Sequence, residues 1–132
     1  MNKLRIKIIA STIVGIGMIF NPCFAYEEDD SENAEIIHLI EYIGDADCTF
    51  FRNGAEYKAS HAKLFIEYKY DDNKEEINST EEFIKLSATK STSSGIGYKV
   101  RCNNNETSSA NWLAKELAAY RNLMSEKNKT GS

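Results

Sequence analysis

The sequence predicts an α+β domain in which a small antiparallel sheet, a hairpin plus one strand, is covered by helices in the order αββααβα. Three observations predict this class. Apolar residues recur at helical spacing in four segments, an Asn-Gly pair separates two short β-favouring runs, and two cysteines flank the strands that these signals outline. No internal repeat is apparent in the sequence.

The chain begins with the pattern of a secretory signal peptide over residues 1–25. A basic start leads into the apolar run 8–20, and a break before a small residue fits cleavage after Ala25. The apolar run is shorter than the ~20 residues of a membrane span. Pro22 stands where lipidation of Cys23 needs a small residue. We therefore expect an exported chain with no membrane insertion after cleavage.

The mature chain is acidic. The signal segment holds three of the 16 basic residues and none of the 20 acidic ones, so cleavage leaves a net charge of −7. This charge argues against nucleic acid and against anionic membrane surfaces as partners. Residues 26–30 are expected to form an acidic flexible N-terminus and residues 125–132 a flexible tail, which leaves 31–124 as a single domain.

The first predicted element is a helix over residues 31–43, ended by Gly44. Its helical face is apolar and consists of Ile36, Ile37, Leu39, Ile40 and Ile43. A hairpin follows, because Asn53-Gly54 between the β-favouring runs 48–52 and 55–58 selects a two-residue type I′ turn. Closure over two residues sets the register: Phe50 opposite Tyr57, and Arg52 opposite Ala55.

Two helices are predicted after the hairpin. Ser60 can cap the first, which runs to about Tyr70, and residues 71–76 form a charged connection. Ser79 and Glu82 have the spacing of a capping box for the second, shorter helix.

The last part of the domain is predicted as strand, loop and helix. The strand covers residues 98–102 and the polar loop 103–107. Ser109 can cap the final helix, whose apolar residues at helical spacing are Trp112, Leu113, Leu117 and Tyr120.

Two cysteines remain after cleavage, Cys48 and Cys102. In a small exported domain they are expected to form a disulfide, because the compartment permits oxidation and the core is modest. Cys48 opens the first strand and Cys102 closes the last one, so the bond predicts that these strands lie side by side and antiparallel.

The segment 88–102 holds two motifs that resemble active-site sequences. Ser87 and Lys90 match S-x-x-K, in which lysine activates a serine one helical turn away, but the partner elements of that enzyme class are missing. A small hydrolase or transferase using Ser87 or Ser91 with Lys90 therefore stays an alternative function. Gly95-Ile-Gly97 follows a helix and precedes a strand, the reverse of a phosphate-binding order, and is expected to give the backbone freedom to begin the strand.

Carboxylates suggest two metal sites, and both patterns are incomplete. Residues 71–82 place acidic or amide side chains at the first, third, fifth and twelfth positions of an EF-hand loop, but Glu76 replaces the glycine at the sixth. A degenerate calcium site there is the second alternative. Glu35-x-x-His38-x-x-Glu41 lacks the second half of a di-iron set. We expect no cofactor and no metal.

Several segments carry a family resemblance: Phe51–Gly54, Ala62, Tyr68-Lys69, Ser79–Ile84, Ala88–Ser91, Ser94-Gly95, Tyr98–Cys102, Trp112-Leu113, Leu117 and Tyr120. In this order they are similar to the YfeK-like family of small exported Gram-negative bacterial proteins, a domain of unknown function. The resemblance implies a periplasmic location. It implies no catalytic or ligand residue.

The sequence favours a non-enzymatic binding or accessory module over an enzyme. The loop 89–94 is rich in hydroxyls and longer than a helix-to-strand turn requires, in a chain poor in catalytic side chains. The candidate binding residues are Lys90, Ser91, Thr92, Ser93, Arg101 and Arg52. The expected partner is a periplasmic protein or a cell-envelope component.

Overall fold

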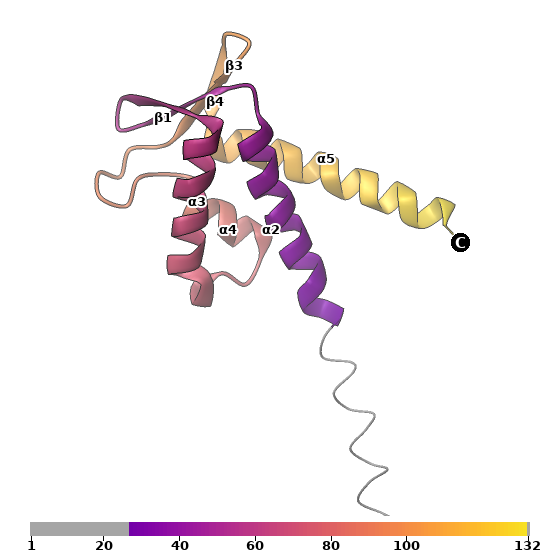
Figure 1. The fold of residues 1–132 in the computed structure, drawn as a ribbon. Helices are drawn as coiled ribbons and strands as arrows, with labels where there is room; N and C mark the ends of the chain where they lie inside the picture. The colour runs from indigo at the N-terminus through magenta and orange to yellow at the C-terminus, as the bar shows by residue number, and fades with distance from the viewer. Residues whose placement is uncertain (1–26, 132) are drawn as a thin grey trace, which may run out of the picture. The chain divides into compact units, whose positions relative to one another are not determined.

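The computed structural model describes residues 27–131 (Figure 1). The predicted signal peptide lies outside the described residues. The chain divides after Glu32 into two units, and the domain described below is the second, which starts at Asn33. Among residues 27–131, none of the helices combines the length and the apolar character that a membrane crossing requires.

The first helix, α2, covers Glu27–Asp45 and so begins four residues before the predicted start. The expected flexible segment 26–30 is therefore helical from Glu27 onward.

The sheet has four antiparallel strands in the order β2-β1-β3-β4. The predicted α+β class is confirmed, and so is the first hairpin, β1 (Thr49–Arg52) with β2 (Ala55–Lys58), in the predicted register. The fourth strand corrects the prediction. Residues 103–107 were expected to be a loop, but Asn103 and Asn104 form a turn with φ of 51° and 67°, and β4 (Asn105–Ser108) pairs with β3 (Lys99–Cys102). Because every side chain of β4 is exposed, it has no apolar alternation to reveal it.

The two hairpins form a structural repeat that the sequence does not show. Each has two four-residue strands, a two-residue turn and a helix that follows at once, and the second lies 50 residues after the first. Phe50 and Val100 are equivalent in this repeat, and they pair with each other where β1 meets β3. Both are buried, so the two halves meet at the centre of the sheet.

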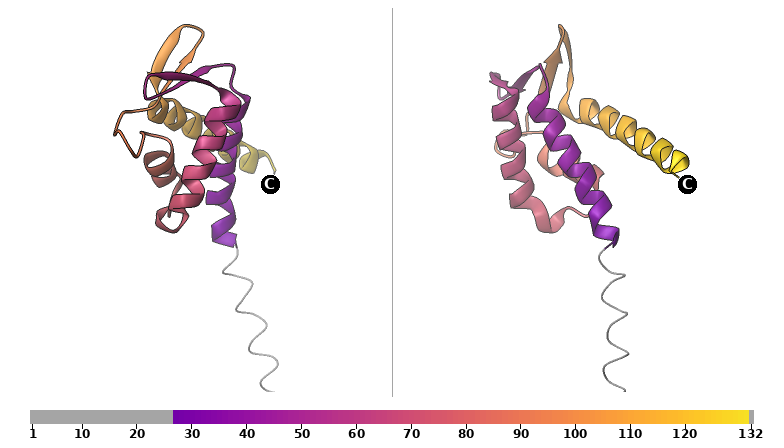
Figure 2. Two further views of the ribbon diagram at one scale, coloured as in Figure 1. Left: turned by 60° about the vertical axis from the view of Figure 1, so that its left-hand side comes forward. Right: turned by 45° about the vertical axis from the view of Figure 1, so that its right-hand side comes forward.

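Helices α3 (Ala59–Asn73) and α5 (Ser109–Thr130) lie against the sheet, together with α2 (Figure 2). The 3₁₀ turn η1 (Lys74–Glu76) follows α3, and α4 (Thr80–Ser87) packs on α3 and α5 away from the strands. The core between helices and sheet contains Ile36, Leu39, Ile40, Ile43, Phe50, Ala62, Ile66, Phe83, Ile84, Ala88, Tyr98, Val100, Leu113 and Leu117.

One of the three predicted N-terminal helix caps is correct, and the predicted stop at Gly44 lies inside α2, which continues to Asp45. The Ser79 hydroxyl accepts a hydrogen bond from the Glu82 backbone N–H at 3.1 Å. The predicted cap Ser60 lies inside α3, and α5 is capped by Ser108 instead of Ser109. Both helices follow directly from a strand, so the end of the hairpin determines where they begin. Helix α5 also continues to Thr130, through most of the expected flexible tail.

The predicted disulfide is present between Cys48 and Cys102, with a Cα–Cα distance of 4.6 Å. It connects the residue before β1 with the last residue of β3, and these two strands are antiparallel neighbours, as predicted. The bond therefore holds together the two halves of the repeat.

Candidate functional site

The Ser/Thr loop folds back on itself between α4 and β3. The Ser91 backbone N–H donates to the Ile96 carbonyl and the Gly95 N–H donates to the Ser91 carbonyl, both at 2.9 Å. Lys90 and Gly97 form an antiparallel bridge at the base of the loop. Of the two glycines expected to give backbone freedom, only Gly95 has a positive φ, at 72°. The loop is therefore a hydrogen-bonded hairpin-like turn.

The side chain of Asn53 attaches this loop to the first hairpin. Its amide oxygen accepts from the Ser94 hydroxyl at 2.5 Å, and its amide nitrogen donates to the Ser91 hydroxyl at 3.4 Å. Ser91 is only 1% exposed, and its hydroxyl also contacts that of Ser93. Ser91 thus holds the loop in place, and the loop hydroxyls left at the surface are those of Thr92, Ser93 and Ser94.

Thr92 and Ser93 lie on one side of a groove of about 260 Å³. The opposite side is helix α3, which contributes a continuous stripe at helical spacing. Arg52 reaches the groove from the end of β1. The lining residues are Arg52, Phe65, Tyr68, Lys69, Asp72, Asn73, Thr92, Ser93 and Tyr98. We call this hollow the α3–loop groove.

The structure brings three of the six predicted binding residues together in this groove: Arg52, Thr92 and Ser93. Arg101 lies on the other face of the sheet, where it pairs with Glu56 at 3.0 Å. The reason is the pleat, because neighbouring strands alternate their side chains and the observed register places residue 101 on the opposite face from residue 52. Lys90 is exposed and does not line the groove.

Lys69 is a groove residue that the sequence did not indicate. Its ammonium group donates to the Lys90 carbonyl at 2.6 Å and lies 5.1 Å from the centre of the Tyr98 ring. These contacts hold a positive charge between α3 and the loop. The signal available in the sequence was the pair Tyr68-Lys69, which is one of the segments that carry the family resemblance. In the structure Tyr68 is 72% exposed and also lines the groove.

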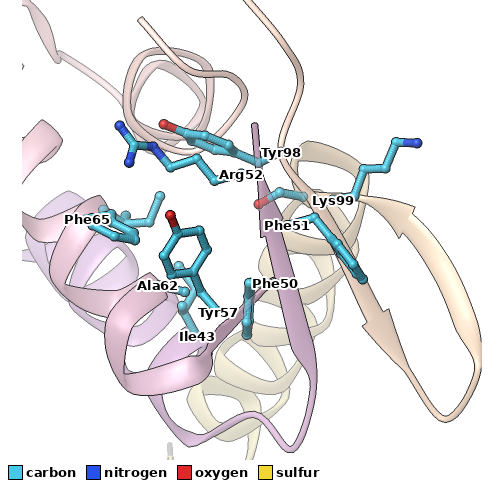
Figure 3. A pocket seen from close by; sticks show the side chains of 11 residues that line it. Ile43, Phe50, Phe51, Arg52, Tyr57, Ala62, Phe65, Tyr98 and Lys99 are labelled. Atoms are coloured by element: carbon cyan, nitrogen blue, oxygen red, sulfur yellow. The ribbon is translucent and has the colours of Figure 1, made fainter. Parts of the chain in front are cut away.

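A small apolar cavity of about 30 Å³ adjoins the groove (Figure 3). The two share Arg52, Phe65 and Tyr98 as lining residues. In Figure 3 the side chains of Arg52 and Tyr98 lie next to each other above Tyr57 and Phe65. The apolar part of the cavity lining also includes Ile43, Phe50, Ala62 and Ile66.

The geometry around Ser87 and Lys90 does not support a Ser/Lys catalytic pair. Ser87 is fully buried in the core, and its hydroxyl has no hydrogen-bond partner among the described residues. Lys90 is exposed to solvent, whereas the mechanism needs a buried lysine beside the serine hydroxyl. Ser91, the other candidate nucleophile, has its hydroxyl within hydrogen-bonding distance of Asn53 and Ser93.

Two of the buried serines, Ser87 and Ser91, give a matched stability test. Ser87→Ala is expected to raise the free energy of unfolding by about 1 kcal/mol, because it removes a buried hydroxyl without a partner. Ser91→Ala is expected to lower it by about 1 kcal/mol, because it removes contacts to Asn53 and Ser93. Urea denaturation measures both changes. Shifts of the same sign would contradict this assignment of the two hydroxyls.

Two carboxylates of the calcium-loop pattern, those of Asp71 and Glu82, make other contacts in the structure. Glu82, the residue at the twelfth loop position, accepts from the Asn78 backbone N–H at 2.7 Å at the start of α4. Residues 74–76 form η1 where an EF-hand has its open turn. Within the part of the chain that the structure describes, no three His, Cys, Asp or Glu side chains gather in a way that could hold a metal ion.

The Glu35, His38 and Glu41 series connects α2 to its neighbours instead of converging on one point. His38 contacts Glu116 of α5 at 2.7 Å, and Glu41 pairs with Lys63 of α3 at 2.7 Å. Glu35 accepts from Arg121 at 2.8 and 2.9 Å and from the Thr80 hydroxyl at 2.6 Å. These three residues hold the helices together.

The Arg121 cluster makes stability depend on pH. Hydrogen bonds from Arg121 hold the pKa of Glu35 and of Glu81 below their usual range. A lowered pKa in the folded state stabilises the protein above the unfolded value of 4.5, and this contribution is lost as the pH falls through the folded pKa. We therefore expect the thermal midpoint of Arg121→Gln to lie below that of the wild type at pH 7 and to approach it below pH 4. A difference that stays constant from pH 7 to 3 would contradict this.

The fold and groove define a class of protein: a small disulfide-linked α+β domain, built from two ββα units, with a polar groove beside an apolar cavity. The chain belongs to the family of unknown function DUF5329, which matches residues 30–121. Comparison with curated proteins and with solved structures finds no match.

Proposed function

We propose that this protein is an exported, non-enzymatic binding module that takes its ligand in the α3–loop groove. The observation that carries the proposal is the meeting of Arg52, Thr92 and Ser93, from separate segments of the chain, in one groove. The signal-peptide pattern and the YfeK-like resemblance support a location in the periplasm of a Gram-negative bacterium.

The groove has the rigidity that recognition needs. The loop side is held by the Asn53 side chain and by the Lys69 ammonium group. The helix side is anchored through Ala62 and Ile66, which are buried in the core. A site ordered before the ligand arrives loses less conformational entropy on binding.

In-cell photo-crosslinking tests the proposal. A benzoylphenylalanine replaces Thr92 in the groove, and in the control it replaces Lys115, an exposed residue of α5 outside the groove lining. We expect an adduct from position 92, none from position 115, and a several-fold loss of the adduct when Tyr68→Ala is added. Equal amounts of adduct from both positions, or an amount of adduct from position 92 that Tyr68→Ala does not change, would contradict the proposal that the ligand binds in the α3–loop groove.

A further inference from the structure

Arg52 is an arginine without an acidic partner. Among residues 27–131 there are three arginines, and two of them are ion-paired, Arg101 with Glu56 and Arg121 with Glu35 and Glu81. The guanidinium group of Arg52 forms no hydrogen bond or ion pair with any described residue. Its guanidinium carbon lies 4.9 Å from the centre of the Phe65 ring.

Arg101 is a useful comparison for Arg52, because both guanidinium groups lie against an aromatic ring. The guanidinium carbon of Arg101 lies 4.8 Å from the centre of the Phe51 ring, almost the same distance as between Arg52 and Phe65. Its guanidinium group also pairs with the Glu56 carboxylate at 3.0 Å. Arg52 therefore has the same contact with an aromatic ring, but no carboxylate pairs with it. The nearest acidic lining residue along α3 is Asp72, seven positions beyond Phe65 and so about 10 Å further along the helix axis.

The surroundings of Arg52 indicate the ligand chemistry. A guanidinium held against a ring presents a planar fork of donors, which matches a carboxylate. The adjoining apolar cavity of about 30 Å³ has room for a group of about methyl size. Asp72 at the other end of the groove disfavours a ligand with many negative charges, so the complementary ligand carries one carboxylate with a small apolar group next to it.

The length of the groove favours a peptide. The stripe from Phe65 to Asn73 spans nine residues of α3, or about 12 Å along the helix axis, which accommodates three or four extended residues. The hydroxyls of Thr92 and Ser93 and the amide of Asn73 can bond peptide groups along this length. Lys69, in the middle of the stripe, adds a second positive charge near the carboxylate end.

Building on the proposed function, we propose that the α3–loop groove binds the free C-terminus of a peptide that ends in a small apolar residue. Arg52 binds the terminal carboxylate, and the cavity behind it receives the last side chain. The residues before it extend along α3 toward Asp72.

Calorimetric titration with two peptides tests the inference: acetyl-Gly-Gly-Ala with a free carboxylate, and the same peptide with a C-terminal amide. We expect the acid to bind at least about tenfold more tightly, because the amide loses a charge-assisted pair of hydrogen bonds. Raising the salt concentration should weaken the binding of the acid peptide more than the binding of the amide peptide. Acetyl-Gly-Gly-Gly should bind about threefold to fourfold more weakly than the alanine acid, because it leaves the cavity empty.

Two variants make the experiment specific. Arg52→Gln should abolish the preference for the acid, whereas Arg101→Gln, which changes the matched arginine on the other face, should keep it. In the wild type, the side-chain Nε–H resonance of Arg52 should shift when the acid is added and not when the amide is added. The thermal midpoint of each protein is measured first to confirm that it is folded.

Equal binding of acid and amide, no binding of either, or an unchanged preference in Arg52→Gln would overturn the inference. Inorganic phosphate binding as tightly as the acid would also overturn it, in favour of a general anion site. None of these outcomes decides the proposed function, which depends on the crosslinks from position 92.

Discussion

Removal of the Cys48–Cys102 bond is expected to lower the free energy of unfolding by about 4 kcal/mol. The two cysteines are 54 positions apart, and closing a loop of this length removes much of the conformational entropy of the unfolded chain. For a domain of this size, 4 kcal/mol is a large part of the total stability. The measurement is urea denaturation of the oxidised protein and of the variant with both cysteines changed to alanine.

Reduction provides the control for this prediction. A reductant should lower the stability of the oxidised wild type by a similar amount and leave the double-alanine variant unchanged. A wild type and variant with the same denaturation midpoint would show that the bond adds no stability to the antiparallel β1–β3 pair that it spans.

Leu113→Ala is expected to lower the free energy of unfolding by about 3–4 kcal/mol. Leu113 has no exposed surface and lies in the core, so truncation removes buried apolar area and leaves a cavity. Leu123→Ala is the matched control, since it is the same substitution on the same helix at a residue that is 50% exposed. We expect a change below about 0.5 kcal/mol there.

Denaturation of both leucine variants with one protocol measures the difference. If Leu123→Ala destabilised the protein as much as Leu113→Ala, the distal part of α5 would be covered in solution by a surface that residues 27–131 of one chain do not supply. If both changes were small, Leu113 would not belong to the core.

The first hairpin shows how much of the fold local sequence can determine. The Asn53-Gly54 turn needs positive φ at both positions, and the observed values are 53° and 79°. A two-residue turn leaves one register, so Phe50 opposite Tyr57 could be predicted without any knowledge of the rest of the chain. The second hairpin has the same construction, but its asparagine turn and fully exposed edge strand leave no apolar pattern to recognise.

The candidate site was predictable only in part, because it depends on how segments far apart in the sequence pack together. The disulfide indicated that β1 and β3 are neighbours, which correctly suggested that Arg52 lies close to the segment before β3. It did not indicate the face on which each side chain lies, so Arg101 was included with Arg52 although the pleat separates them. Lys69 was missed because α3 could not be positioned relative to the loop.

The sequence by itself determined the elements whose causes are local, namely the turn at Asn53-Gly54, the Ser79 cap and the apolar helix faces, and it also indicated the pairing of Cys48 with Cys102. Only the tertiary structure decided which side chains meet. It buried Ser91 beneath Asn53, exposed Lys90, paired Arg101 with Glu56 and left Arg52 on Phe65 without a carboxylate. The physical reason is that backbone conformation depends on near neighbours in the chain, whereas a binding site depends on the register and packing of segments far apart in it.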